Sequence, residues 1–222
     1  MRKLLLGDEA IAQAAIDSGL SGVYAYPGTP STEITEFIQL REEKRGDAQN
    51  PIFCRWATNE KTAMEGALGM SYMGKRALVC MKHVGMNVAA DPFVNSAMTG
   101  VNGGLVVVAA DDPSMHSSQN EQDSRFYGKF AMMPIFEPSS QQEAYEMTRA
   151  AFELSEAVKL PVLMRVTTRM AHSRAVVEIT ENPRKQNEIN RPEDVRTWIL
   201  LPAFAKKRYV KLLEQQDDLM KA

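Results

Sequence analysis

Short apolar runs alternate along the chain with longer stretches of helical periodicity. The apolar runs predict strands at residues 22–26, 52–57, 77–81, 105–110, 135–136 and 161–167. The periodicity between them predicts helices at residues 8–18, 59–73, 87–98 and 143–158, and one that begins at Ser31 and ends in a solvated helix end and loop at 41–46. Run 105–110 is apolar at every position, as a central parallel strand covered on both faces should be. This order predicts an α/β fold, a doubly wound and mostly parallel sheet with helices on both faces.

Local signals suggest where these helices begin and how they face. Asp8 is expected to cap the first helix and Ser31 the second, because both side chains can accept backbone N–H groups. Pro92 lies near the start of the helix at 87–98 or breaks it. Residues 111–128 are polar without a period, so we interpret them as a long functional loop. The inward face of the second helix is expected to consist of Ile34, Phe37, Ile38 and Leu40.

The character of the chain changes near residue 180. Residues 183–196 are polar and charged, and residues 204–220 predict an amphipathic helix. We therefore expect two parts, an α/β domain at 1–180 and a linker with a helical extension at 181–222. Mixed charges on the extension favour a solvated or partner-facing role. Its apolar face is expected to consist of Val210, Leu212, Leu213 and Leu219.

Composition narrows the class of protein. The 222 residues include 26 Lys and Arg against 28 Asp and Glu, a formal net charge of −2, which argues against binding nucleic acid. The only cysteines, Cys54 and Cys80, are too few for a disulfide framework and are not spaced as metal ligands. No run reaches the roughly 18–20 apolar residues that cross a bilayer. The apolar run at residues 4–6 is too short for a signal peptide, so a cytoplasmic location is expected.

In open α/β sheets, ligands bind beyond the carboxyl ends of the strands. That rule singles out the loops at residues 26–31, 58–61, 82–87 and 111–125. None of them carries the Gly-x-Gly-x-x-Gly fingerprint of dinucleotide binding or a Walker A sequence. The chain also lacks the Gly-x-Ser-x-Gly elbow of α/β-hydrolases. The order of strands and helices is therefore similar to that of a Rossmann fold, but the chain lacks the phosphate-binding motifs of that fold.

A few side chains in these loops could carry chemistry, and each also has a plain structural interpretation. Glu60 follows Asn59, a helix cap, and is either a catalytic carboxylate or a favourable charge at a helix N-terminus, worth roughly 0.3–1 kcal/mol. Thr29 either holds a ligand or closes a turn. His83 and His116 are either catalytic acids, bases or hydrogen-bond donors, or loop histidines whose ring nitrogens are hydrogen-bonded by neighbouring residues.

The pair Asp111–Asp112 looks like a metal motif. It has no third ligand at a recognisable spacing, so a role in shaping the loop and capping a helix is the safer interpretation. We therefore expect no metal ligands in this chain.

Four segments together resemble one family. They are Tyr26–Ile34, Asn59–Lys61 with Ala67–Tyr72, His83–Pro92 and Asp111–Arg125. In this order they are similar to the thiamine diphosphate-dependent 2-oxoacid:ferredoxin oxidoreductases, and the last two point to the alpha subunit of the indolepyruvate branch. The likeness covers about residues 3–180 and implies the pyrimidine-binding domain of the thiamine diphosphate-binding fold.

The resemblance implies roles for particular residues. Glu60 corresponds to the glutamate that hydrogen-bonds the ring nitrogen of the cofactor's aminopyrimidine and supports proton removal from the thiazolium. The other positions that match cofactor-binding segments are Gly28, Thr29, Val84, Gly85, Met86 and Asn87. The candidates for holding the substrate carboxylate are His83, His116 and Arg125, of which arginine suits a bidentate grip.

The family also carries parts that this chain lacks. The Gly-Asp-Gly…Asn signature, which holds Mg²⁺ and through it the diphosphate, is absent. Two cysteines cannot supply a 4Fe-4S cluster, so Mg²⁺ and the clusters are expected elsewhere in the complete enzyme. The resemblance implies a diphosphate-binding domain on the same subunit or another chain, a beta subunit, ferredoxin, CoA and an aryl pyruvate, and a homo-oligomer.

Three functions remain open from the sequence. The first is oxidative decarboxylation of aryl pyruvates to aryl-acetyl-CoA with reduction of ferredoxin, in which this chain is inactive alone. The second is a two-chain thiamine diphosphate-dependent 2-oxoacid decarboxylase. The third is a non-catalytic assembly domain, which the amphipathic segment at 204–220 favours.

Overall fold

The computed structural model describes residues 1–46 and 49–221, so Ala222 of the predicted extension lies outside the described residues. Its centre is a six-stranded sheet in the order β3-β2-β4-β5-β7-β6. All of its neighbouring strands are parallel, which confirms the predicted fold class. The strands are β2 (Gly22–Ala25), β3 (Phe53–Trp56), β4 (Ala77–Lys82), β5 (Leu105–Asp111), β6 (Ile135–Phe136) and β7 (Val162–Thr167).

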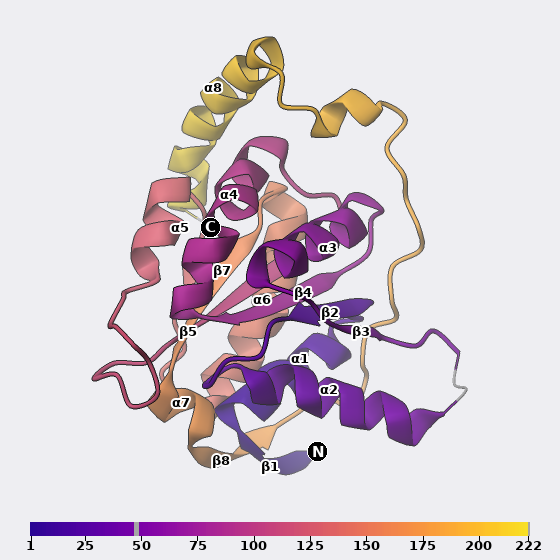
Figure 1. Ribbon diagram of the computed structural model, residues 1–222. Helices are drawn as coiled ribbons and strands as arrows, with labels where there is room; N and C mark the ends of the chain where they lie inside the picture. Colours follow the sequence, from indigo (N-terminus) through magenta and orange to yellow (C-terminus); the bar gives the residue numbers. More distant parts are fainter. Residues whose placement is uncertain (47–48, 222) are drawn as a thin grey trace.

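Helices cover both faces of this sheet (Figure 1). One apolar cluster joins the sheet to α1 (Gly7–Asp17), α2 (Thr32–Arg45) and α6 (Gln141–Val158). A second cluster on the other face joins it to α3 (Glu60–Tyr72), α4 (His83–Thr99) and α5 (Arg125–Ala131). Every residue of β5 is buried, because the strand lies between two others with helices on both sides. The uniformly apolar run therefore predicted the centre of the sheet correctly.

A second, antiparallel sheet pairs β1 (Arg2–Leu6) with β8 (Arg174–Glu178), and the sequence pattern predicted neither strand. The apolar segment near the start of the chain is thus a strand. Its Leu4 is 63% exposed and the opposite Val176 is 59% exposed, so the usual alternation of buried apolar and exposed polar residues is missing. The partners lie far apart in the chain, and a local pattern carries no information on such a pairing.

The expected cap of the first helix was wrong. Leu6 occupies the N-cap position of α1, and the Glu9 carboxylate accepts the Leu6 backbone N–H at 2.8 Å. Asp8 lies inside the helix and is fully buried. Ser31 does take the N-cap position of α2, but its side chain donates to the Gly28 carbonyl oxygen instead of capping the helix.

Two predicted boundaries and one predicted face also differ from the structure. Helix α4 begins at His83 and runs through Pro92 to Thr99, so Pro92 does not break it. The loop predicted at 111–128 ends earlier, because α5 begins at Arg125. On α2, Ile34 and Ile38 are buried as expected, whereas Leu40 is 54% exposed.

The segment after residue 180 runs back along the body of the domain (Figure 1). Trp198, in a short 3-10 helix (Val195–Trp198), stacks on Tyr72 with ring centroids 3.9 Å apart. Helix α8 (Pro202–Leu219) buries Leu212 in the second apolar cluster, with Leu219 packed beside it. Val210 and Leu213, expected on the same apolar face, are about half exposed. No helix in the described part of the chain is long and apolar enough to span a membrane.

A buried arginine ties several elements together at the amino end of β4. Arg76 is fully buried, and its guanidinium donates to both carboxylate oxygens of Glu156, at 2.9 and 2.6 Å. It also donates to Glu153 at 2.8 Å and to the backbone oxygen of Ser18 at 2.9 Å. This side chain therefore joins β4, α6 and the turn after α1.

Candidate functional site

The parallel strands bring the loops singled out by the sequence to one edge of the sheet. The side chain of Lys82, at the carboxyl end of β4, connects two of them. A Cβ atom added to Gly28 would lie 3.2 Å from the Lys82 Cβ, so the loop after β2 packs against this side chain. Lys82 Nζ also donates to the Ser117 backbone oxygen, in the loop after β5, at 2.7 Å.

Glu60 begins α3 at this edge. The Asn59 side chain caps the helix by accepting the Thr62 N–H at 2.9 Å, as the sequence predicted. The Glu60 side chain is half-buried and lies over Gly85, in the first turn of α4. A Cβ on Gly85 would come within 2.6 Å of both Glu60 Cγ and Oε1. The contact therefore requires glycine at position 85.

The Glu60 carboxylate makes no hydrogen bond or ion pair within residues 1–46 and 49–221. The nearest charged neighbour in sequence, Lys61, instead pairs with Asp91 at 3.0 Å. A half-buried carboxylate without a partner can accept a hydrogen bond from a ligand, and the missing side chain of Gly85 leaves the space in which Glu60 lies. These two residues can hold the edge of a planar, hydrogen-bond-donating ring.

The other predicted cofactor positions differ in how far they are exposed. Thr29 is exposed and Val84 is half-buried. Met86 is fully buried in the second apolar cluster. Asn87 is exposed, and its Oδ1 accepts a hydrogen bond from the Tyr127 hydroxyl. Thr29 and Val84 thus offer surface at this edge, while Met86 supports Gly85 from the core.

The three candidates for the substrate carboxylate lie in different surroundings. His83 is fully buried, with Nε2 3.0 Å from the Asn120 backbone oxygen. His116 is exposed and lines a cavity with Pro113 and residues 167–169. Arg125 pairs with Asp123 at 2.6 Å and Glu137 at 3.4 Å. The Asp123 carboxylate raises the pKa of Arg125 and already occupies its guanidinium.

A buried charge network beside Arg125 was not anticipated from the sequence. Arg165, 9% exposed on β7, pairs with Asp111 at 2.6 Å and also with Glu137. Asp111 in turn accepts the Ser124 backbone N–H, at the N-cap of α5, at 3.1 Å. This confirms the loop-shaping and capping interpretation of Asp111. An arginine inside an otherwise apolar strand was the signal that could have revealed the network.

Asp112 holds the first half of the loop that follows β5. Its Oδ2 accepts the Ser117 N–H at 2.7 Å and the Ser118 hydroxyl at 2.6 Å. Its Oδ1 accepts the Thr168 hydroxyl at 2.8 Å. Although burial raises the pKa of Asp112, these hydrogen bonds lower it well below its usual value, so the carboxylate stays ionised.

The chain is similar in sequence to one protein family and to curated relatives within it. The family model described as "Pyruvate flavodoxin/ferredoxin oxidoreductase, thiamine diP-bdg" matches residues 13–206. The chain is 46% identical to the indolepyruvate oxidoreductase subunit IorA of Archaeoglobus fulgidus over 217 residues, which is 97% of this chain and 34% of that protein. The corresponding subunit of Thermococcus kodakarensis is also 46% identical, over 98% of this chain and 34% of its own length.

More distant proteins share less of the sequence. The 2-oxoglutarate synthase subunit KorA of Methanothermobacter thermautotrophicus is 28% identical over 79% of this chain and 47% of its own length. The structure of the 2-oxoglutarate:ferredoxin oxidoreductase from Magnetococcus marinus superimposes with a TM-score of 0.76, covering 99% of this chain and 45% of that one, at 18% identity. That structure shows the fold. The chain spans about a third of the length of the IorA proteins it matches.

Proposed function

The chain belongs to the thiamine diphosphate-binding family of pyruvate flavodoxin/ferredoxin oxidoreductases, and from this premise we propose that residues 1–180 form the pyrimidine-binding half of a thiamine diphosphate site. The complete enzyme oxidatively decarboxylates aryl pyruvates to aryl-acetyl-CoA and reduces ferredoxin. Identities of 44–46% with indolepyruvate oxidoreductase subunits, against 28% with a 2-oxoglutarate synthase subunit, support the aryl pyruvate over 2-oxoglutarate. Residues 181–222 form an extension, of which the described part up to residue 221 packs on the domain through Trp198 and Leu212.

The observation that carries this proposal is the Glu60 carboxylate above Gly85, which has no hydrogen-bond or ion-pair partner among the described residues. It fits the aminopyrimidine of thiamine diphosphate, whose ring nitrogen can donate a hydrogen bond once it carries a proton. When bound, the cofactor supplies the electron sink for loss of CO₂. Glu60 holds the proton at the ring nitrogen, while Gly85 and Val84 leave room for the flat ring.

Other residues at the same edge take supporting roles. Thr29 is exposed beside Gly28, where its hydroxyl can hydrogen-bond a substrate carboxylate or carbonyl. His116 stands on the exposed loop, so it can donate to an anionic substrate. His83 is fully buried with its Nε2 on the Asn120 backbone oxygen, so it can act on a substrate only if this edge of the sheet opens. Arg125 is half exposed, but Asp123 and Glu137 already neutralise it, which weakens it as a candidate for the substrate carboxylate.

The proposal requires further protein parts. The relatives named above are subunits, so other chains are implied. We propose that a diphosphate-binding domain, on the same subunit or another chain, supplies Mg²⁺, and that the clusters lie outside these residues. Burial raises the pKa of Cys54 to about 11 and that of the fully buried Cys80 well above its usual value. Neither thiol is therefore a ready thiolate ligand for a cluster.

The 222-residue chain by itself is expected to bind thiamine diphosphate weakly and to turn over no 2-oxoacid. It offers the pyrimidine contacts but no Gly-Asp-Gly…Asn signature for the metal and the diphosphate. Calorimetric titration of the purified chain with thiamine diphosphate and Mg²⁺ checks this. Binding at submicromolar concentration would show that the diphosphate site lies within this chain.

The activity is tested with the complete enzyme, in which this segment is combined with the remaining subunits. We expect indolepyruvate or phenylpyruvate to support ferredoxin reduction and acyl-CoA formation, and 2-oxoglutarate to be a poor substrate. Release of aldehyde without ferredoxin reduction would instead identify a two-chain decarboxylase. Activity that does not depend on Glu60 would identify a non-catalytic assembly domain.

Replacing Gly85 by alanine is expected to lower the affinity of the complete enzyme for thiamine diphosphate about tenfold or more. The new methyl group would meet Glu60 at 2.6 Å, so the carboxylate must turn away from its position. Stability should change by only about 1 kcal/mol, because alanine favours the helix while Glu60 yields. Cofactor titration of the activity, together with thermal melting, measures both effects.

Gly69 provides the matched control for this substitution. It also lies inside a helix, α3, but a Cβ there would meet no atom within 4 Å. Gly69→Ala is expected to leave cofactor affinity unchanged and to raise the free energy of unfolding by about 0.5–1 kcal/mol. Equal losses of cofactor affinity in both variants would mean that the contact between Gly85 and Glu60 does not determine cofactor binding.

A further inference from the structure

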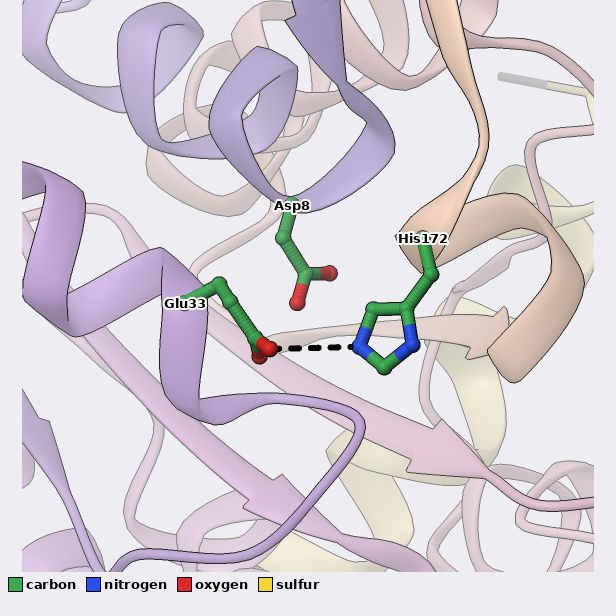
Figure 2. A group of neighbouring side chains, drawn as sticks. All are labelled: Asp8, Glu33 and His172. Atoms are coloured by element: carbon green, nitrogen blue, oxygen red, sulfur yellow. Dashed lines mark ion pairs between the residues drawn. The ribbon is translucent and has the colours of Figure 1, made fainter. Parts of the chain in front are cut away.

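Three side chains from separate elements converge on the face of the sheet opposite α3 and α4. They are Asp8 at the start of α1, Glu33 in the first turn of α2 and His172 at the end of α7 (Thr168–His172). Figure 2 shows all three pointing toward one point. One ligand atom of each lies within 4.8 Å of the others. The elements involved contribute nothing to the Glu60 and Gly85 contact.

Asp8 is the most unusual member of this cluster. Its side chain is 0% exposed, yet neither carboxylate oxygen has a hydrogen-bond partner among the residues that the structure describes. A buried carboxylate without a partner is costly, and such groups in folded proteins are normally paired or bound to a metal. Burial first, and then the charges of Glu33 and Glu9, raise the pKa of Asp8 well above its usual value. Within the described chain, Asp8 therefore lacks the partner that a buried carboxylate normally has.

Glu33 and His172, the other two members, do not supply the missing hydrogen-bond partner of the Asp8 carboxylate. Glu33 Oε1 lies 3.4 Å from His172 Nε2, and Glu33 Oε2 is buried with no partner in the described part of the chain. Two ligands on a tetrahedral ion with bonds of about 2.0–2.1 Å lie about 3.4 Å apart. The spacing of this pair is therefore that of two ligands sharing one ion.

We propose that Asp8, Glu33 and His172 bind a divalent transition-metal ion of the Zn²⁺ class. Two carboxylate oxygens with one imidazole nitrogen suit such an ion better than Mg²⁺ or Ca²⁺, which favour all-oxygen sites. The side chains of Glu33 and His172 are each 35% exposed, so water can complete the coordination on the outer side. The ion ties α1, α2 and α7 together and offsets the buried charge of Asp8. This site is independent of the function proposed above.

The test uses the 222-residue chain, stripped of metal with a chelator and without thiamine diphosphate. Zn²⁺ alone is titrated by calorimetry, and bound metal is counted after gel filtration. We expect one Zn²⁺ per chain and a higher melting temperature with Zn²⁺. His172→Gln, at a partly exposed position, should fold normally and weaken binding at least about tenfold. Asp8→Asn should abolish binding and raise the melting temperature of the metal-free protein, since it removes a buried charge.

Two matched variants separate this site from surface binding. His116→Gln removes an exposed loop imidazole, and Glu36→Gln removes an exposed carboxylate on the same helix as Glu33. Both are expected to bind Zn²⁺ like the unmodified chain. The proposal is wrong if the unmodified chain binds no stoichiometric Zn²⁺, or if His116→Gln weakens binding as much as His172→Gln.

Discussion

Replacing Glu60 by glutamine is expected to lower the turnover of the complete enzyme at least about 100-fold, in the range typical of losing a proton-transfer group. Glutamine has nearly the same size and keeps an oxygen that accepts a hydrogen bond, but it cannot hold or release a proton. Glu60 makes no hydrogen bond or ion pair with the rest of the described chain, so the change should alter the free energy of unfolding by less than about 0.5 kcal/mol.

The measurement is kcat with indolepyruvate for the reconstituted Glu60→Gln enzyme, alongside thermal melting of the variant. Glu65→Gln is the control, because Glu65 is an exposed carboxylate on the same helix. It should retain normal turnover. Turnover of the Glu60 variant within about threefold of normal, equivalent to about 0.65 kcal/mol, would remove Glu60 from the mechanism.

Replacing Arg76 by methionine is expected to cost about 3 kcal/mol of folding free energy. The variant loses four hydrogen bonds from a fully buried guanidinium and leaves Glu156 with only the more distant Arg184, at 3.9 Å, as a cation in the described chain. Breaking a buried ion pair typically costs about 3–5 kcal/mol. The lower end applies here because the Glu156 side chain is 20% exposed and can gain some water.

The dependence of this loss on pH provides a second check. Burial raises the pKa of Glu156, but hydrogen bonds from Arg76 and Asn187 prevail and lower it from 4.5 to about 2. A lowered pKa in the folded state stabilises the protein above about pH 4.5, and that contribution disappears as the pH falls through about 2. The stability gap between normal and Arg76→Met protein should therefore be largest near neutral pH and shrink in acid.

Urea unfolding from pH 7 down to the acid range measures this gap. Arg149→Met is the control, since Arg149 lies exposed on α6 and stacks on Tyr145 with its guanidinium 5.8 Å from the ring centroid. It should cost less than about 1 kcal/mol at any pH. A gap for Arg76→Met that stays constant down to pH 2 would mean that Glu156 is not its main partner.

The sequence predicted those parts of the fold that local patterns encode. The apolar run in β5 marked the central strand because burial on both faces leaves no polar position. Asn59 marked the start of α3 because its side chain replaces a missing backbone acceptor. The prediction that Asp8 caps α1 was wrong, because the Glu9 side chain accepts the N-terminal N–H instead and Asp8 is buried.

The candidate site was predictable in its location but not in its contacts. Parallel strands must place Glu60 and Gly85 at one edge, so their loops could be named in advance. The close approach between them depends on how α3 packs against α4, which no spacing reveals. In the same way, only the folded chain shows that Asp123 and Glu137 occupy Arg125. The cluster of Asp8, Glu33 and His172 was invisible because its members are spread over most of the chain.

The pairing of β1 with β8 has a consequence for how the chain folds during synthesis. Arg2 pairs with Glu178, so the first strand must wait until nearly the whole domain has been translated. At about 5–20 residues per second, the ribosome needs roughly 10–35 s to deliver the partner. During that time the Leu4–Leu6 segment carries unpaired backbone groups and apolar side chains, features that attract chaperones and neighbouring nascent chains. The sheet of β1 and β8 therefore closes only after β8 has been synthesised, late in the folding of this domain.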